Sequence, residues 1–198
     1  MNTQDYLLEL MFSKLALKII VRVLDNVDSD TLNEPIGYVD DTYLICLAKR
    51  NSIELARYFT LRPGVEVDTR NSSSYKDTAL SWAVFQGHSE IVKILISAKA
   101  DVNMCTRISG KNLYYWAYSQ RQYGIFKLLM SSGATLTSQD YYGQSIVDRL
   151  PEDSVYLDLL RSYKGVLKKV LHTYLYHRAF HYERSIVKMI LTYYPGSV

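Results

Sequence analysis

The chain has 198 residues, of which 48% are hydrophobic and 22% are charged, with four prolines and a formal net charge of +3. It is long and apolar enough to bury a sizeable core as one elongated domain without disulfides. Its two cysteines, Cys46 and Cys105, form no spaced framework, which argues against a disulfide scaffold or zinc cluster and for a reducing compartment. The apolar runs at 15–24 and 186–191 contain charges or stop too early for a signal peptide or a spanning helix, so we expect a cytoplasmic protein.

Apolar residues recur at helical spacing near the N-terminus, between Asp5 and Val27. We predict one or two helices here, within an N-terminal unit of residues 1–37. This unit is expected to cover the first of the repeats that follow. A stack of repeated units needs such a cap because an end unit otherwise exposes its core face.

Four related segments then follow one another over residues 38–163, at a spacing of about 34 residues. Each segment opens on a Ser, Thr or Asn, continues with two apolar patterns of helical period, and ends in a short polar stretch. The clearest copy is 78–103, preceded by 42–68 and followed by 112–137 and by 145–160, the last of which contains a small deletion. The pattern predicts stacked helix–turn–helix units.

Residues 78–103 resemble the ankyrin-repeat pattern T-P-L-H-x-A, G-H, E-I-V-K-L-L and G-A-D-V-N. The match includes Thr78, the Gly-His pair at Gly87 and the run from Glu90, while Lys99 stands where the family has glycine. The resemblance implies an all-α ankyrin-repeat solenoid of about four repeats with a helical N-terminal cap. It also implies a protein-binding surface and no enzyme activity, catalytic residue or cofactor.

Particular side chains give this pattern a physical reason. We expect the inner helices to begin near Thr42, Thr78, Asn112 and Ser145, where a short polar side chain caps the first free amides. Gly87 suits the tight link between helices because it adopts a positive φ without a Cβ clash. The small Ala83 and Ala117 let helices approach closely. The predicted core stripe of the clearest repeat is Leu80, Ala83, Ile91, Val92, Ile94 and Leu95.

The C-terminal segment differs from the repeats in charge. Residues 161–198 carry seven Lys or Arg and one Asp or Glu, a net charge of +6, whereas the rest of the chain has a net charge of −3. Residues 164–198 also contain an amphipathic stretch around Ser185 that looks like an outer ankyrin helix. We interpret this segment as a basic, aromatic helical cap or a drifted fifth repeat. The charge suits phosphates or an acidic protein, but no nucleic-acid motif accompanies it, so a nucleic-acid partner is not expected.

Metal and catalytic sites are not expected. His177 and His181 are spaced to share a helix face near His172, yet no Cys, Asp or Glu completes a ligand set. Ser81, His88 and Asp148 occur at repeat positions that point to different places, and no nucleophile elbow or phosphate-binding glycine loop accompanies them.

Partner binding is expected at the loop tips before each inner helix and on the solvent face of that helix, as the resemblance implies. Exposed aromatic side chains there supply contact area with few rotors to freeze. Some of them, Tyr75 and Tyr142 above all, have the alternative of folding over the adjacent hairpin. The candidate partner-binding residues are Tyr38, Lys49, Arg50, Tyr75, Asp77, Phe85, Gln86, Ile108, Lys111, Ser119, Gln120, Tyr141, Tyr142 and Gln144.

Two functions are consistent with these features. The first is a monomeric adaptor, scaffold or inhibitor that binds a partner protein through the concave repeat surface. Its small size and degenerate repeats resemble ankyrin proteins that viruses and intracellular bacteria deploy in the host cytosol or nucleus. The second is a recruiter whose basic C-terminal helices dock another complex, such as a ubiquitin-ligase component, although residues 164–198 match neither an F-box nor a SOCS box.

Overall fold

The computed structural model describes residues 3–13, 17–37, 40–74, 76–105, 110–136, 138–151 and 154–162. Over these residues the chain forms eleven helices, and β-pairing is limited to two isolated bridges. An all-α fold is therefore confirmed. The helices are α1 (Thr3–Met11), α2 (Leu17–Leu24), α3 (Ser29–Asn33), α4 (Tyr43–Lys49), α5 (Ile53–Leu61), α6 (Ala79–Gln86), α7 (Ser89–Ser97), α8 (Leu113–Ser119), α9 (Tyr123–Ser131), α10 (Ile146–Arg149) and α11 (Val155–Ser162).

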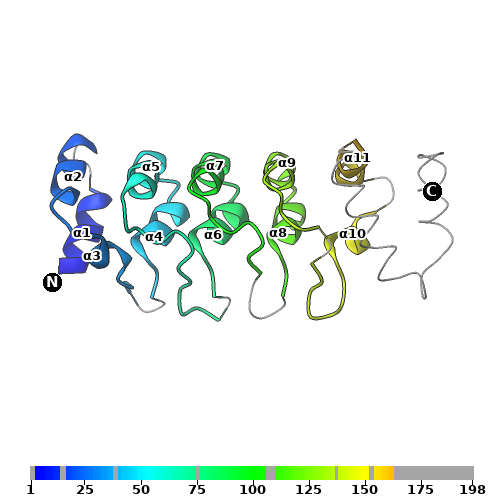
Figure 1. Ribbon diagram of the computed structural model, residues 1–198, viewed down its shortest axis with the longest axis horizontal. Coiled ribbons are helices and arrows are strands. Elements are labelled where there is room, and N and C mark those ends of the chain that lie inside the picture. The colour runs from blue at the N-terminus through cyan, green and yellow to red at the C-terminus, as the bar shows by residue number, and fades with distance from the viewer. Residues whose placement is uncertain are drawn as a thin grey trace.

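Successive helix pairs stand side by side in one row (Figure 1). The inner helices α4, α6, α8 and α10 form one layer, and the outer helices α5, α7, α9 and α11 form a second. Helix α6 packs against α4 on one side and α8 on the other, while α7 packs between α5 and α9. The predicted solenoid of about four helix pairs is confirmed.

The inner helices begin where the sequence predicts. Their N-cap residues are Thr42, Thr78, Asn112 and Ser145. The Thr78 side chain accepts a hydrogen bond from the amide of Ser81 at 3.2 Å, and the Ser81 hydroxyl accepts one from the Thr78 amide at 2.9 Å. At the start of α10 the Asp148 carboxylate accepts hydrogen bonds from both the amide and the hydroxyl of Ser145. Each start satisfies backbone donors that a helix would otherwise leave free.

The predicted core stripe is buried throughout. Leu80, Ala83, Ile91 and Leu95 have no exposed surface, and the other two members of the stripe are also buried. Ala117, one repeat further on, is buried as completely as Ala83. Gly87 ends α6 at φ +82°, the left-handed conformation expected of it. The sequence therefore located both the buried face and the turn.

A ladder of hydrogen bonds joins one repeat to the next, which the sequence alone did not reveal. In each case the side chain of a residue at the end of one repeat accepts from a backbone amide about one repeat further along. The distances are 2.8 Å, 3.0 Å and 2.7 Å in chain order. The pairs are Asn33 with Glu66, Asp68 with Asp101, and Asn103 with Thr135.

The N-terminal unit follows the register of the repeats. The two helices expected between Asp5 and Val27 are α1 and α2, and α2 packs against the outer helix α5. A third helix, α3, was not predicted because it has only five residues. Its last residue, Asn33, makes the first bond of the hydrogen-bond ladder. The unit therefore continues the stack in addition to covering its end.

The last helix pair is shorter than the others. Helix α10 has four residues, whereas α4, α6 and α8 have seven or eight. It ends at Arg149 because Pro151 disfavours helical geometry at the residue before it. Leu150 and Pro151 therefore lie outside the helix, and α10 is about half as long as its counterparts. The interpretation of residues 164–198 as a cap or drifted repeat lies outside the described residues.

Replacing Ala83 with leucine should destabilise the fold by about 1–3 kcal/mol, since the larger side chain enters a fully packed contact between helices. Chemical denaturation followed by circular dichroism measures the change. The matched control is Gln86→Leu, which adds a leucine to the exposed side of the same helix and should shift the midpoint little. Equal midpoints for the two variants would show that Ala83 does not lie at a packed contact.

Candidate functional site

A row of aromatic side chains crosses the solvent-facing side of the inner helices. It consists of Trp82 and Phe85 on α6 and of Trp116 and Tyr115 on α8, and we call it the aromatic row. Neighbouring ring centroids lie 5.9, 5.4 and 5.3 Å apart, with interplanar angles of 88°, 80° and 85°. Such edge-to-face contacts hold the rings in fixed orientations. Phe85 is nevertheless 40% exposed, so the row remains open to a partner.

Basic side chains flank both ends of the aromatic row. The ammonium of Lys49, on α4, lies 4.5 Å from the centroid of the Trp82 ring and pairs with Asp41. At the other end the ammonium of Lys111 lies 4.0 Å from the centroid of the Tyr115 ring. Positive charges above aromatic rings are attracted by the electron density of the ring face. The surface thus combines apolar contact area with fixed charge.

A cleft of about 330 Å³ opens between α6 and α8 within the aromatic row. Its polar members are Asp77 and Ser81. Burial raises the pKa of the Asp77 carboxyl above its ordinary value, although hydrogen bonds from Ser81 and Ser73 and the nearby charge of Lys49 act in the opposite direction. Burial therefore disfavours the charged form of the Asp77 side chain. The aromatic walls of the cleft are Trp82, Phe85 and Trp116.

The hairpin before α6 fixes Asp77 in this position. Asn71 is almost fully buried, and its side-chain oxygen accepts from the Asp77 amide at 3.0 Å and from the Ser73 hydroxyl at 2.7 Å. The side-chain amide of Asn71 donates to Asp41 at 2.7 Å in the preceding repeat. A buried amide that uses both ends in this way ties two neighbouring loop tips together.

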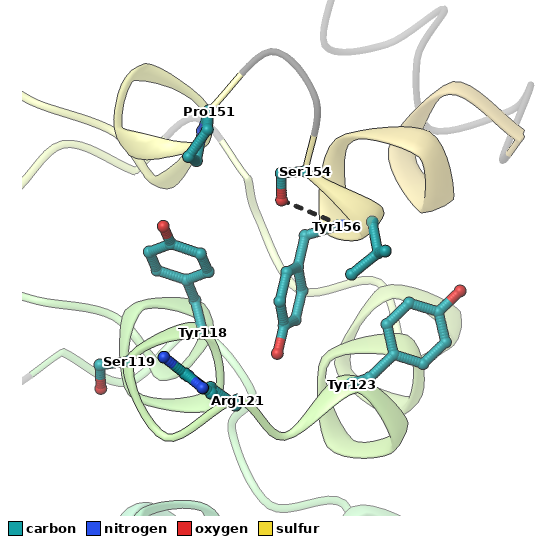
Figure 2. Close-up of a pocket in the computed structure, with 8 residues that line it drawn as sticks. Tyr118, Ser119, Arg121, Tyr123, Pro151, Ser154 and Tyr156 are labelled. Carbon is teal, nitrogen blue, oxygen red and sulfur yellow. Dashed lines mark hydrogen bonds between the residues drawn. The ribbon is translucent and has the colours of Figure 1, made fainter.

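A second cleft, of about 790 Å³, lies where the short α10 leaves space beside the turn between α8 and α9. In Figure 2 the ring of Tyr156, from α11, stands between Tyr118 and Tyr123, with Arg121 below and Pro151 above. The centroid of the Tyr156 ring lies 5.3 Å from that of Tyr118 and 5.9 Å from that of Tyr123. This cleft offers phenol groups and one guanidinium at the edge of the solenoid.

The structure brings several predicted binding residues together. Phe85 and Asp77 line the first cleft, Lys49 flanks it, and Ser119 lines the second cleft. Lys111 contacts the aromatic row, and it is partly buried like Lys49 and Asp77. Three candidates, Tyr38, Tyr75 and Ile108, lie outside the described residues. Besides Phe85, the exposed candidates are Arg50, Gln86, Ser119, Gln120, Tyr141, Tyr142 and Gln144.

The two neighbouring tyrosines at the last hairpin differ in their relation to the hairpin before it. Tyr142 is 76% exposed, so it does not fold over the adjacent hairpin. Tyr141 instead approaches Gly110 there, and a Cβ at Gly110 would stand only 2.7 Å from a carbon of the Tyr141 ring. Gly110, at φ +64°, therefore permits this close approach. Tyr141 remains 68% exposed despite this contact.

Sequence reasoning missed the two tryptophans. Trp82 and Trp116 stand 34 residues apart, each at the fourth position after an N-cap, so they occupy the same place in consecutive repeats. That periodicity was the available signal. The second cleft gave no comparable signal, because it lies beside the short α10 and its rings are distant in sequence.

Other chemistry is sparse over the described residues. They contain no group of three metal-ligating side chains, and none of their helices is long and apolar enough to cross a membrane. Cys46 and Cys105 are free thiols. Burial, with a smaller contribution from Asp41, raises the pKa of the Cys46 thiol to about 11, so it stays protonated at neutral pH and is a poor nucleophile.

The fold defines a helical repeat protein with an exposed aromatic surface on its inner helices. A family profile described as ankyrin repeats (3 copies) matches residues 17–104 and 44–140 of the chain. The protein therefore belongs to the ankyrin-repeat family, whose repeats generally serve as protein–protein interaction modules and are typically non-catalytic. The first match begins at the start of α2, in agreement with the repeat register of the N-terminal unit. Comparison with curated proteins finds no match.

Replacing Asp77 with asparagine should raise the free energy of unfolding at pH 7. The folded-state pKa of Asp77 lies above its ordinary value of 3.8, so Asp77 favours folding below that value and this contribution is lost as the pH rises through the folded-state pKa. The gain of the variant should therefore shrink below pH 3.8. Thermal unfolding from pH 7 to below pH 3.8 measures this gain in stability. The control is Glu54→Gln, on the exposed side of α5. If the stability of Asp77→Asn relative to wild type is lower at pH 7 than at low pH, the raised pKa assigned to Asp77 is wrong.

Proposed function

We propose that the protein is a non-catalytic adaptor, scaffold or inhibitor that binds a partner protein through the solvent-facing side of its inner helices. The observation that carries this proposal is the cleft at Phe85, a 40% exposed ring held between two tryptophans. The free thiols of Cys46 and Cys105 support action of the protein in a reducing compartment such as the cytoplasm.

The aromatic row has the properties of an interface centre. Interface energy concentrates in a few residues, with tryptophan and tyrosine enriched among them. Here both tryptophans of the chain lie in one row, and their orientations are fixed by edge-to-face contacts before a partner arrives. Rings that are already ordered lose little conformational entropy on binding. The flanking Lys49 and Lys111 supply a polar rim.

A second candidate function is recruitment of another complex by the C-terminal segment. The net charge of +6 over residues 161–198 favours it, because an excess of one sign attracts an acidic surface. In this case the repeats hold one protein and the segment docks a second one. Truncation to residues 1–163, with circular dichroism to establish that it folds, separates the two functions in a pull-down from cell lysate.

We expect the double variant Phe85→Ala, Tyr141→Ala to lose capture of the partner that such a pull-down identifies. Removing hot-spot aromatics costs about 2 kcal/mol or more each at an interface. The circular dichroism spectrum and melting point should change little, since both side chains are exposed. Binding is measured by titration calorimetry with the purified partner.

The matched control is Leu61→Ala, which removes an apolar side chain that is 78% exposed at the end of the outer helix α5 and should leave capture intact. Reversal of Lys168, Lys169 and Arg178 to glutamate should also have little effect. If these charge reversals abolish capture while the double variant retains it, the basic segment is the docking surface.

A further inference from the structure

The first repeat contains a complete site for a positively charged group. The ammonium of Lys49 is hydrogen-bonded to the Asp41 carboxylate and lies 4.5 Å from the centroid of the Trp82 ring, which belongs to the next repeat. Carboxylate and indole thus hold the same cation from two sides. This arrangement combines charge pairing with attraction to the ring face.

The carboxylate and the indole have counterparts one repeat later, and both counterparts line the cleft between α6 and α8. Asp77 directly precedes the N-cap Thr78, as Asp41 precedes Thr42. Trp116 is the fourth residue after its N-cap, as Trp82 is after its own. The counterpart of Lys49, seven residues after the N-cap, is Phe85, which has no charge.

The carboxylate of this second site forms no ion pair within the part of the chain that the structure describes. No ion pair among the described residues includes Asp77, whose recorded hydrogen bonds come from two serine hydroxyls at 3.3 and 3.4 Å. The charge of Lys49 acts on Asp77, but its ammonium is already paired with Asp41. Asp41, Asp77 and Lys49 together leave one net negative charge beside the cleft.

We propose that the cleft between α6 and α8 receives a lysine or arginine side chain of the partner protein. The cation lies against the indole of Trp116 beside the Asp77 carboxylate, and Phe85 covers its aliphatic stem. Lys49 in the first repeat is the internal template for this contact. The inference rests on the proposed function, because it names the chemistry of the group that the inner-helix face binds.

Selection from a random heptapeptide display library tests the proposal, with the full chain and its Asp77→Asn variant as baits. We expect peptides selected on the wild type to share a lysine or arginine at one position, and the identity of that residue tells ammonium from guanidinium. On Asp77→Asn that preference should disappear. Glu54→Gln, which removes the same charge from the outer layer, should select the same peptides as the wild type.

The affinity of a selected peptide follows from tryptophan fluorescence, since Trp82 and Trp116 are the only tryptophans of the chain and both line the cleft. Changing the shared basic residue of the peptide to glutamine should weaken binding by about tenfold, as should Asp77→Asn. Selection of only acidic or apolar peptides, an unchanged preference on Asp77→Asn, or no selected peptide at all overturns the proposal.

Failure of this proposal is distinct from failure of the proposed function. If Asp77→Asn binds peptides and partner like the wild type while Phe85→Ala loses the partner, the inner-helix face is the binding site but its occupant is not a cation. If Phe85→Ala also keeps the partner, the binding site lies elsewhere.

Discussion

The structure depends on the lateral contact between one helix pair and the next. A single pair cannot bury its own apolar face, so each pair is stable only where a neighbour covers it. Ala83 and Ala117 are fully buried at this contact, and the ladder of hydrogen bonds from Asn33 to Thr135 links the N-terminal unit and the first three repeats. The inner helices stand in one layer (Figure 1), and their lateral sides are used in these contacts.

Because the packing contacts lie elsewhere, the exposed side of the inner helices varies between repeats without loss of the fold. The positions seven residues after the N-cap hold Lys49, Phe85 and Ser119 in three consecutive repeats, three side chains with different chemistry. None of them is in the buried core, and each therefore changes at little cost to packing. Phe85 at this position widens the apolar part of the surface and leaves Asp77 without a cation. The cleft thus results from one exposed substitution within a regular frame.

The sequence predicted the fold well because its signals are local. Capping residues such as Thr78 and the helical spacing of buried residues are read along a single repeat. Lys99, which stands where the family has glycine, keeps the positive φ of that position. Its φ is +68°, and that of Gly133, one repeat later, is +80°. The short α3 was missed because an element of five residues has no clear period, whereas the start of α10 was predicted and only its length of four residues was not. The clefts were missed because their walls come from different repeats, so spacing within one repeat does not reveal them.

The central claim is that the cleft formed by Trp82 and Trp116 lies within the partner interface. Fluorine NMR of the chain labelled with 5-fluorotryptophan tests this claim directly, because the two tryptophans give two resonances and tryptophans of an unlabelled partner give none. The variants Trp82→Phe and Trp116→Phe assign the signals. Our account predicts that both resonances shift when the captured partner is added. Formation of the complex, established by sedimentation, with both resonances unchanged would contradict it.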